Sequence, residues 1–210
     1  RCCTQNGIRG GSATVHFPIW HQEIRDILVL KNNKGTEDNR VRKLDYSIQI
    51  SKLFYERFIQ DEEISLFSPH SVPDLFESFG TPDFDELYCS YENDKSIPRT
   101  TIGAQELIMD LLKERSETGR IYIMNIDHCN EHSSFKDKVS MSNLCQEITL
   151  PTEPIQHIDA IDGEIALCIL SAINVGKLKN LDELEELCDL SVRSLAVSYT
   201  HLTLPTRLMV

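Results

Sequence analysis

The segment from Ser142 to Ile148 places three reactive side chains at alternate positions, in the order Asn143, Cys145 and Glu147. In an extended strand, residues two apart share a face and lie roughly 6 to 7 Å apart. An amide, a thiol and a carboxylate on one edge suit a small-molecule site in which the thiol does redox, radical or nucleophilic chemistry and the carboxylate moves protons. The same alternation describes a strand with one polar face and a buried cysteine, and periodicity alone favours that simpler structure.

A second thiol, Cys168, lies in the apolar run from Glu164 to Leu170. A cysteine inside an apolar strand is usually part of the core. The strands of α/β proteins also present reactive groups at their ends, so the position leaves both possibilities open.

The stretch from His128 to His132 contains two histidines four residues apart and Cys129, all of which are metal-ligand types. Residues at this spacing meet on one face only in a helix, and we predict a loop here. We therefore expect a hydrogen-bonding loop rather than a metal site.

The opening from Asn6 to Gly11 is rich in glycine and predicts a loop. It contains neither GxGxxG nor GxxxxGK[ST], so neither nucleotide-binding fingerprint applies. The loop does offer a mobile backbone carrying Arg9, whose guanidinium can reach a base edge, a phosphate or a carboxylate. An ordinary turn is the alternative.

The composition is that of a globular chain with an acidic balance. The 210 residues include 33 acidic and 21 basic side chains, a formal net charge of −12, which argues against non-specific nucleic-acid binding. No apolar run approaches the roughly 20 residues that span a bilayer, and no signal segment opens the chain. Seven cysteines without paired CxxC motifs argue against a zinc ribbon and suggest reduced thiols, so we expect a cytoplasmic location.

Helices and short apolar strands are expected to alternate along the chain, which indicates the α/β class. Strands are predicted over residues 12–17, 64–67, 120–126 and 164–172, with a further extended segment over 143–150. Helices are predicted over residues 21–30, 45–59, 73–79, 83–91, 103–117 and 181–197, with Asn180 as the cap of the last.

Two motifs, Asn143 to Ile148 and Gly163 to Cys168, resemble the catalytic core of the large subunit of class I ribonucleoside-diphosphate reductase, of the type found in bacteria and their large phages. The resemblance runs from about Gln5 to Leu195. Other similar stretches are residues 6–11, 17–21, 30–33, 42–46, 66–70, 118–120 and 125–128.

The resemblance implies part of a ten-stranded α/β barrel with a central finger loop, and it implies roles for four residues. Cys145 would become a thiyl radical that abstracts hydrogen from the ribose 3′ position. Glu147 would take the 3′-hydroxyl proton, Asn143 would hydrogen-bond the ribose hydroxyls, and Cys168 would be one of two reducing cysteines. The implied substrate-binding residues are Asn143, Leu144, Cys145, Gln146 and Glu147. A thiyl radical must be kept from water, so we expect a dry, enclosed site.

The opening loop resembles the family's specificity loop, with Gln5, Gly7, Arg9, Gly10 and Gly11 as its candidate residues. Arg9 would sense the bound deoxynucleotide effector and signal to the substrate base, which is coupling between two sites. The implied partners are ribonucleoside diphosphates, ATP and deoxynucleoside triphosphate effectors, a metal-containing small subunit that delivers the radical, a second large subunit, and thioredoxin or glutaredoxin. No cofactor or metal bound to this chain, no membrane and no direct nucleic-acid contact are expected.

Residues 1–196 are therefore expected to form part of a catalytic barrel, and residues 197–210 a non-native tail, since Ser198 to Thr206 does not match the family. The upstream partner of Cys168 and the downstream radical-relay tyrosines are absent, so the chain alone is expected to be inactive. Two rival functions are a non-catalytic, cysteine-bearing α/β module that senses nucleotides, and a metal protein using His128, Cys129 and His132.

Overall fold

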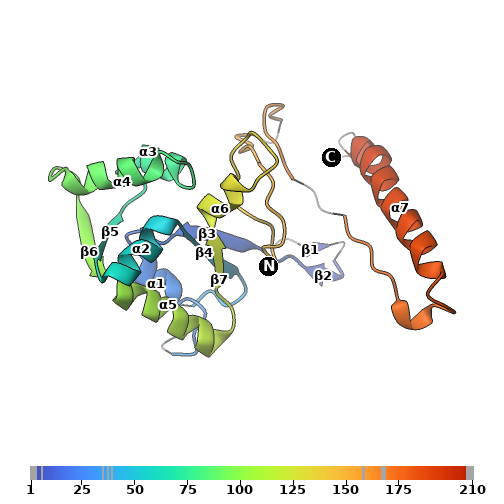
Figure 1. Cartoon of the computed structure of the whole chain (residues 1–210), viewed down its shortest axis with the longest axis horizontal. Coiled ribbons are helices and arrows are strands. Elements are labelled where there is room, and N and C mark those ends of the chain that lie inside the picture. The colour runs from blue at the N-terminus through green and yellow to red at the C-terminus, as the bar shows by residue number, and fades with distance from the viewer. Residues whose placement is uncertain are drawn as a thin grey trace. The chain divides into compact units, whose positions relative to one another are not determined.

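A computed structural model describes residues 4–5, 7–34, 36, 38, 40–157, 159–166 and 169–206. The chain divides into two compact units, residues 1–164 and residues 165–210. The first unit holds every described strand, together with α1 to α6, and the second holds α7 (Figure 1). The α/β class predicted from the sequence is confirmed, and the described residues form no closed barrel.

A three-stranded parallel sheet lies at the centre of the first unit. Its order is β3 (Thr14–Pro18), β4 (Asp45–Ile50) and β7 (Tyr122–Asn125). The prediction of one helix over residues 45–59 is wrong in its first part, because residues 45–50 form the middle strand. Hydrogen bonding to a strand on each side stabilises this extended conformation, and only α2 (Lys52–Gln60) is helical.

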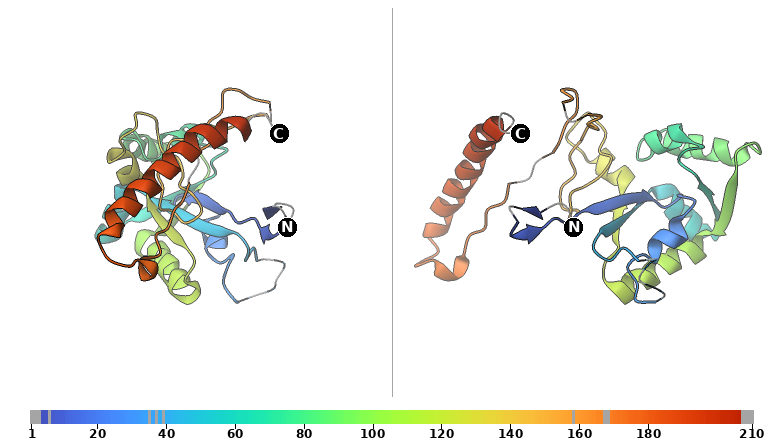
Figure 2. Two further views of the ribbon diagram at one scale, coloured as in Figure 1. Left: turned by 90° about the vertical axis from the view of Figure 1, so that its right-hand side faces the viewer. Right: turned by 180° about the vertical axis from the view of Figure 1, so that it is seen from behind.

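The two faces of this sheet differ in polarity. On β4, Tyr46, Ile48 and Ile50 belong to the buried core, while Ser47 and Gln49 alternate with them and point to the opposite face. The helices α1 (Ile24–Leu28) and α5 (Ala104–Thr118) lie together on one side of the sheet (Figures 1 and 2). The polar face is therefore left for another segment to cover.

A smaller antiparallel sheet pairs β5 (Glu63–Phe67) with β6 (Arg99–Gly103). The helices α3 (Pro73–Ser78) and α4 (Phe84–Asn93) connect its strands. The hydroxyl of Tyr88 donates to Ser65 O at 2.6 Å and accepts from Ser65 N at 2.8 Å, so this buried phenol replaces a strand neighbour for β5. The strand β5 and both helices were predicted from the sequence, whereas β6 was not.

The opening loop is a short antiparallel hairpin. β1 (Thr4–Gln5) pairs with β2 (Arg9–Gly10). Gly7 lies in the turn between them with φ of +72°, a conformation that glycine adopts without steric cost. The predicted loop is therefore confirmed as a turn that carries two paired residues on each side.

The second unit contains a 3₁₀ turn (Val175–Lys177) and the long helix α7 (Glu183–Thr206). Asn180 Oδ1 accepts from Glu183 N at 3.1 Å, which confirms the predicted cap. A strand over 164–172 is not formed by the described residues of that range, where Glu164 alone makes a bridge, to Glu153. A strand needs a hydrogen-bonded neighbour along its length, and beyond Glu164 none pairs with the described part of this segment. The division at residue 197 stays a prediction.

None of the described helices is long and apolar enough to cross a membrane.

Candidate functional site

The segment 140–146 lies on the polar face of the parallel sheet and is fixed there by side chains of β3 and β4 and by a backbone carbonyl of β7. Two side chains of β3 contact the segment: Thr14 Oγ1 donates to Leu144 O at 2.6 Å, and His16 Nε2 lies 3.2 Å from Ser142 O. On β4, Gln49 Nε2 donates to Ser140 O at 2.7 Å. These bonds hold the backbone of the loop without using its own side chains.

The surroundings of His16 favour its neutral form. Burial lowers the pKa of its imidazole, and the hydrogen bond to Ser142 offsets only part of that effect. A carbonyl oxygen only accepts, so Nε2 carries the proton in this contact. The other ring nitrogen, Nδ1, is buried with no hydrogen-bond partner in the structure, so protonating it would place an unsatisfied charge beneath the loop.

The residues around Cys145 form a tight turn, so the extended segment predicted over 143–150 is wrong at its centre. Gln146 N donates to Asn143 O at 3.2 Å, and Gln146 has φ of +63°. Its side chain accepts from Ser47 Oγ at 2.8 Å and donates to Ile123 O at 2.6 Å. The sheet face therefore imposes the turn, and simple two-residue alternation does not extend through it.

The side chain of Asn143 stabilises the same turn from within. Its Oδ1 accepts from Ile148 N at 3.1 Å and lies 3.2 Å from Ser142 Oγ. The hydroxyl of Ser142 donates to Ile148 O at 2.5 Å, closing the loop at its base. The amide nitrogen of Asn143 is not needed for these contacts, which use its oxygen.

Cys145 and Glu147 are both exposed. The dry, enclosed site expected from the sequence is therefore not formed by the described residues. The turn leaves both side chains accessible, while Gln146 between them is half-buried against the sheet. The catalytic roles of Asn143, Cys145 and Glu147 stay predictions.

The segment that leads into this loop is held by Asn130. This residue lies on α6 (Ile126–Glu131), and its amide donates to Val139 O at 3.0 Å while its Oδ1 accepts from Val139 N at 2.8 Å. Val139 is fully buried. A single side chain thus satisfies both backbone groups of a residue that has no strand neighbour.

The remaining predicted site residues are a reducing cysteine and the residues of the opening loop. Cys168 lies outside the described residues, as do the side chains of Gln5 and Arg9. Gly7, Gly10 and Gly11 are exposed on and beside the hairpin. The roles assigned to these six positions stay predictions.

The loop predicted around His128 is instead the helix α6, which ends at Glu131. The rings of His128 and His132 consequently approach each other, with centroids 6.1 Å apart. Burial raises the pKa of the Cys129 thiol, which disfavours the thiolate that a metal would require. Among the described residues, no group of three or more histidine, cysteine or carboxylate side chains could hold a metal ion.

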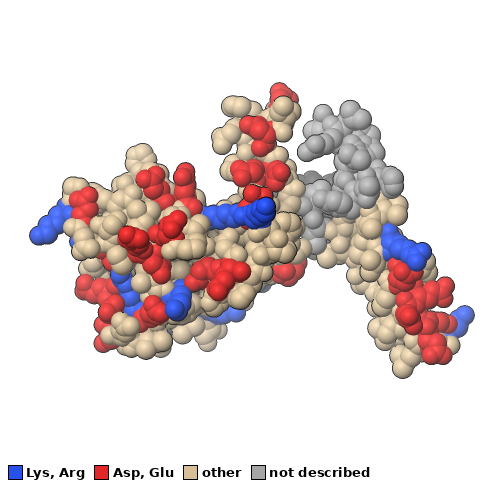
Figure 3. Space-filling view, turned by 45° about the horizontal axis from the view of Figure 1, so that its top comes forward, with Lys and Arg blue, Asp and Glu red and all other residues tan. Residues whose placement is uncertain are grey.

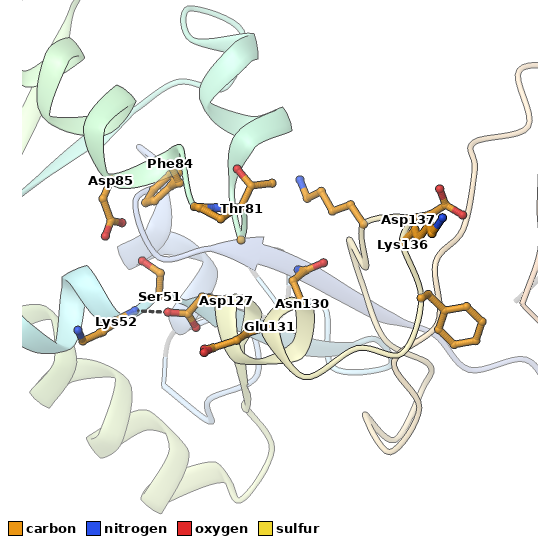
Figure 4. A pocket seen from close by; sticks show the side chains of 14 residues that line it. Ser51, Lys52, Thr81, Phe84, Asp85, Asp127, Asn130, Glu131, Lys136 and Asp137 are labelled. Carbon is orange, nitrogen blue, oxygen red and sulfur yellow. Dashed lines mark hydrogen bonds between the residues drawn. The ribbon is translucent and has the colours of Figure 1, made fainter.

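A cavity of about 520 Å³ that the sequence did not reveal lies beyond the carboxyl ends of β4 and β7 (Figure 4). Asp127 Oδ2 accepts from Lys52 N at 2.6 Å and so caps α2. Burial, and then the charge of Asp127, raise the pKa of Asp85 across the cavity. A usable signal was the position of Ser51 and Asp127 soon after two parallel strands, whose carboxyl ends form crevices.

Acidic side chains are spread over the face drawn in Figure 3, with basic side chains scattered among them. This distribution matches the net charge of −12. On that face no broad basic patch is present among the described residues.

Comparisons with known proteins give a consistent result. Residues 1–208 match the family described as ribonucleotide reductase, barrel domain. The chain is 56% identical over 200 residues to the ribonucleoside-diphosphate reductase subunit alpha of Haemophilus influenzae, covering 93% of this chain and 26% of that protein. It is 51% identical over 160 residues to the reductase 1 subunit alpha of Escherichia coli, covering 74% and 21%. It is 43% identical over 203 residues to the subunit alpha of Enterobacteria phage T4, covering 93% and 26%. The chain spans about a quarter of the length of these relatives.

Proposed function

The chain belongs to the ribonucleotide reductase barrel-domain family, in its class I bacterial and phage type, and we propose that it is the part of a large subunit that reduces ribonucleoside diphosphates to 2′-deoxyribonucleoside diphosphates. One observation carries the proposal: the turn with Cys145 at its exposed side is fixed on the polar face of a parallel sheet by hydrogen bonds from three strands. A thiol that carries a radical must be held rigidly, because small displacements of the reacting atoms lower the reaction rate.

We propose that Cys145 reacts as a thiyl radical and takes the hydrogen atom from the ribose 3′ carbon. Glu147, two residues on and exposed, would accept the proton of the 3′-hydroxyl. The 2′-hydroxyl would take a proton from one of the two reducing cysteines and leave as water. Cys168 and a partner cysteine outside this chain would supply two electrons and end as a disulfide, after which the 3′ hydrogen returns from Cys145.

Asn143 could bind substrate through its side-chain NH₂ group, which makes no hydrogen bond within the turn. Its oxygen accepts from Ile148 N, so the NH₂ group would donate to a ribose hydroxyl. The turn would then remain intact while the substrate binds.

We propose that the exposed turn becomes enclosed in the complete subunit. The three parallel strands would form part of a ten-stranded α/β barrel, and the segment 140–148 would be its finger loop. A barrel places its inward-facing side chains around the axis, and Thr14, His16, Ser47 and Gln49 would be such side chains. Closure would exclude water from Cys145.

The remaining partners follow from the same family membership. The hairpin from Thr4 to Gly10 would be the specificity loop, with Arg9 sensing a deoxynucleoside triphosphate effector, and ATP would be a further effector. A metal-containing small subunit would deliver the radical, a second large subunit would complete a homodimer, and thioredoxin or glutaredoxin would restore the thiols. The isolated chain would be inactive and, within the cell, cytoplasmic.

The test is a chimera in which residues 4–196 replace the matching segment of the Haemophilus influenzae relative. We expect deoxyribonucleoside diphosphate formation, and we expect Glu147→Gln to lower kcat by about 100-fold or more, as for loss of a general base. The control Glu131→Gln, an exposed carboxylate on α6, should retain activity. An inactive but folded chimera, or a fully active Glu147→Gln variant, would contradict the proposal.

A further inference from the structure

We propose that Gln146 and Ser47 form a positioning pair that sets the Cys145 turn on the sheet, and that Gln146 is not a substrate contact. The inference rests on the proposed function for its catalytic consequence. Its structural part, the anchoring of the turn, stands on the contacts of the two side chains alone.

Both ends of the Gln146 amide are engaged by the sheet. Oε1 accepts from Ser47 Oγ of β4 at 2.8 Å, and Nε2 donates to the carbonyl oxygen of Ile123 on β7 at 2.6 Å. In the strand register, Ser47 lies opposite Tyr122, the residue before Ile123. The amide therefore bridges two neighbouring strands, and each of its polar ends is engaged by one sheet contact.

The backbone of Gln146 needs this anchor. Its φ of +63° is a left-handed conformation that a side chain larger than glycine adopts at a cost, and such residues persist where surrounding contacts hold them. The only other residue described with this feature outside glycine, Asp61, ends the helix α2. Gln146 instead lies between two proposed catalytic residues, so the sheet contacts fix the directions in which Cys145 and Glu147 leave the turn.

Ser47 is adapted to this one contact. It is fully buried in the middle strand, where apolar residues would otherwise be expected, and its hydroxyl donates to Gln146. Removing either partner leaves a buried polar atom of the other without its hydrogen bond, which costs more than the bond itself contributes. The two residues should therefore behave as one unit.

Hydrogen exchange in the 210-residue chain tests the anchor, with Gln146→Leu, Ser47→Ala and the double variant. The amides of Gln146 and Ile148 are bonded within the turn, so loosening it should speed exchange in the peptide 141–148 by about fivefold or more, the equivalent of one hydrogen bond. The double variant should exchange no faster than Gln146→Leu. Gln105→Leu, the same change on the exposed surface of α5, is the control and should leave this peptide unchanged.

Kinetics in the active chimera test the catalytic consequence. Gln146→Leu should lower kcat at least fivefold and leave KM within twofold, because it misplaces reacting groups and removes no substrate contact. A rise in KM at unchanged kcat would overturn the positioning role. Exchange at the rate of the control, or effects of the two single changes that multiply in the double variant, would overturn the anchor. An inactive wild-type chimera would count against the proposed function alone. The exchange rates would still show whether Gln146 and Ser47 hold the turn on the sheet.

Discussion

Replacing Asn130 with alanine should destabilise the first unit, because one side chain holds the chain segment that leads into the Cys145 turn. Asn130 makes two hydrogen bonds with the backbone of Val139, at 2.8 and 3.0 Å, and one with Ile126 O at 2.9 Å. Each such bond contributes about 1 kcal/mol, and the N–H and C=O of fully buried Val139 would lose their partner. We expect the free energy of unfolding to fall by about 2 to 3 kcal/mol.

Urea unfolding followed by tryptophan fluorescence measures this change. Trp20 is the sole tryptophan and is completely buried in the first unit, so its emission reports that unit. The control is Asn93→Ala, which removes a single exposed hydrogen bond to Cys89 O on α4 and should cost under about 0.5 kcal/mol. Equal stability of the two variants would refute the role assigned to Asn130.

Two further predictions concern stability. Tyr88→Phe should lower the free energy of unfolding by about 1 to 3 kcal/mol, because it leaves the buried N–H and C=O of Ser65 unpaired; a loss below about 0.5 kcal/mol in the same assay would contradict this. His16 should make the folded state less stable as the pH is lowered. Burial lowers the pKa of this imidazole in the folded state, so as pH falls below about 6.5 the unfolded chain takes up the proton first and is favoured. Between pH 7 and pH 5.5, wild type should therefore lose more stability than His16→Gln, and an identical loss would show that His16 contributes nothing.

Local sequence patterns predicted the elements whose conformation depends mainly on their own residues. The helix α5 followed from the helical spacing of Leu107, Ile108, Leu111 and Leu112, of which the first three are buried and Leu112 is exposed. The strand β4 was missed, although Tyr46, Ile48 and Ile50 alternate with polar residues. It runs almost directly into α2, so the sequence pattern groups Ile48 with Leu53, Tyr55 and Phe58 in one long helix, and the neighbouring strands stabilise the extended conformation instead.

The sequence identified the segment of the candidate site and did not predict its geometry. The motif around Cys145 identified the segment that the sheet holds. Its turn depends on the contact between Gln146 and Ser47, which are 99 residues apart in the sequence, so no local pattern indicates it. The same reason explains why the described residues from 164 to 172 form no strand, because strand pairing depends on partners that a local sequence pattern does not contain.

The central claim is that the thiol of Cys145 performs the chemistry, and Cys145→Ser in the active chimera tests it most directly. A serine keeps the shape of the side chain and cannot carry the thiyl radical, so we expect ribonucleoside diphosphate binding within about twofold of wild type and no detectable deoxyribonucleotide. The matched change Cys89→Ser, on α4, should leave turnover unchanged. Turnover by Cys145→Ser at the rate of the Cys89→Ser control would contradict the claim.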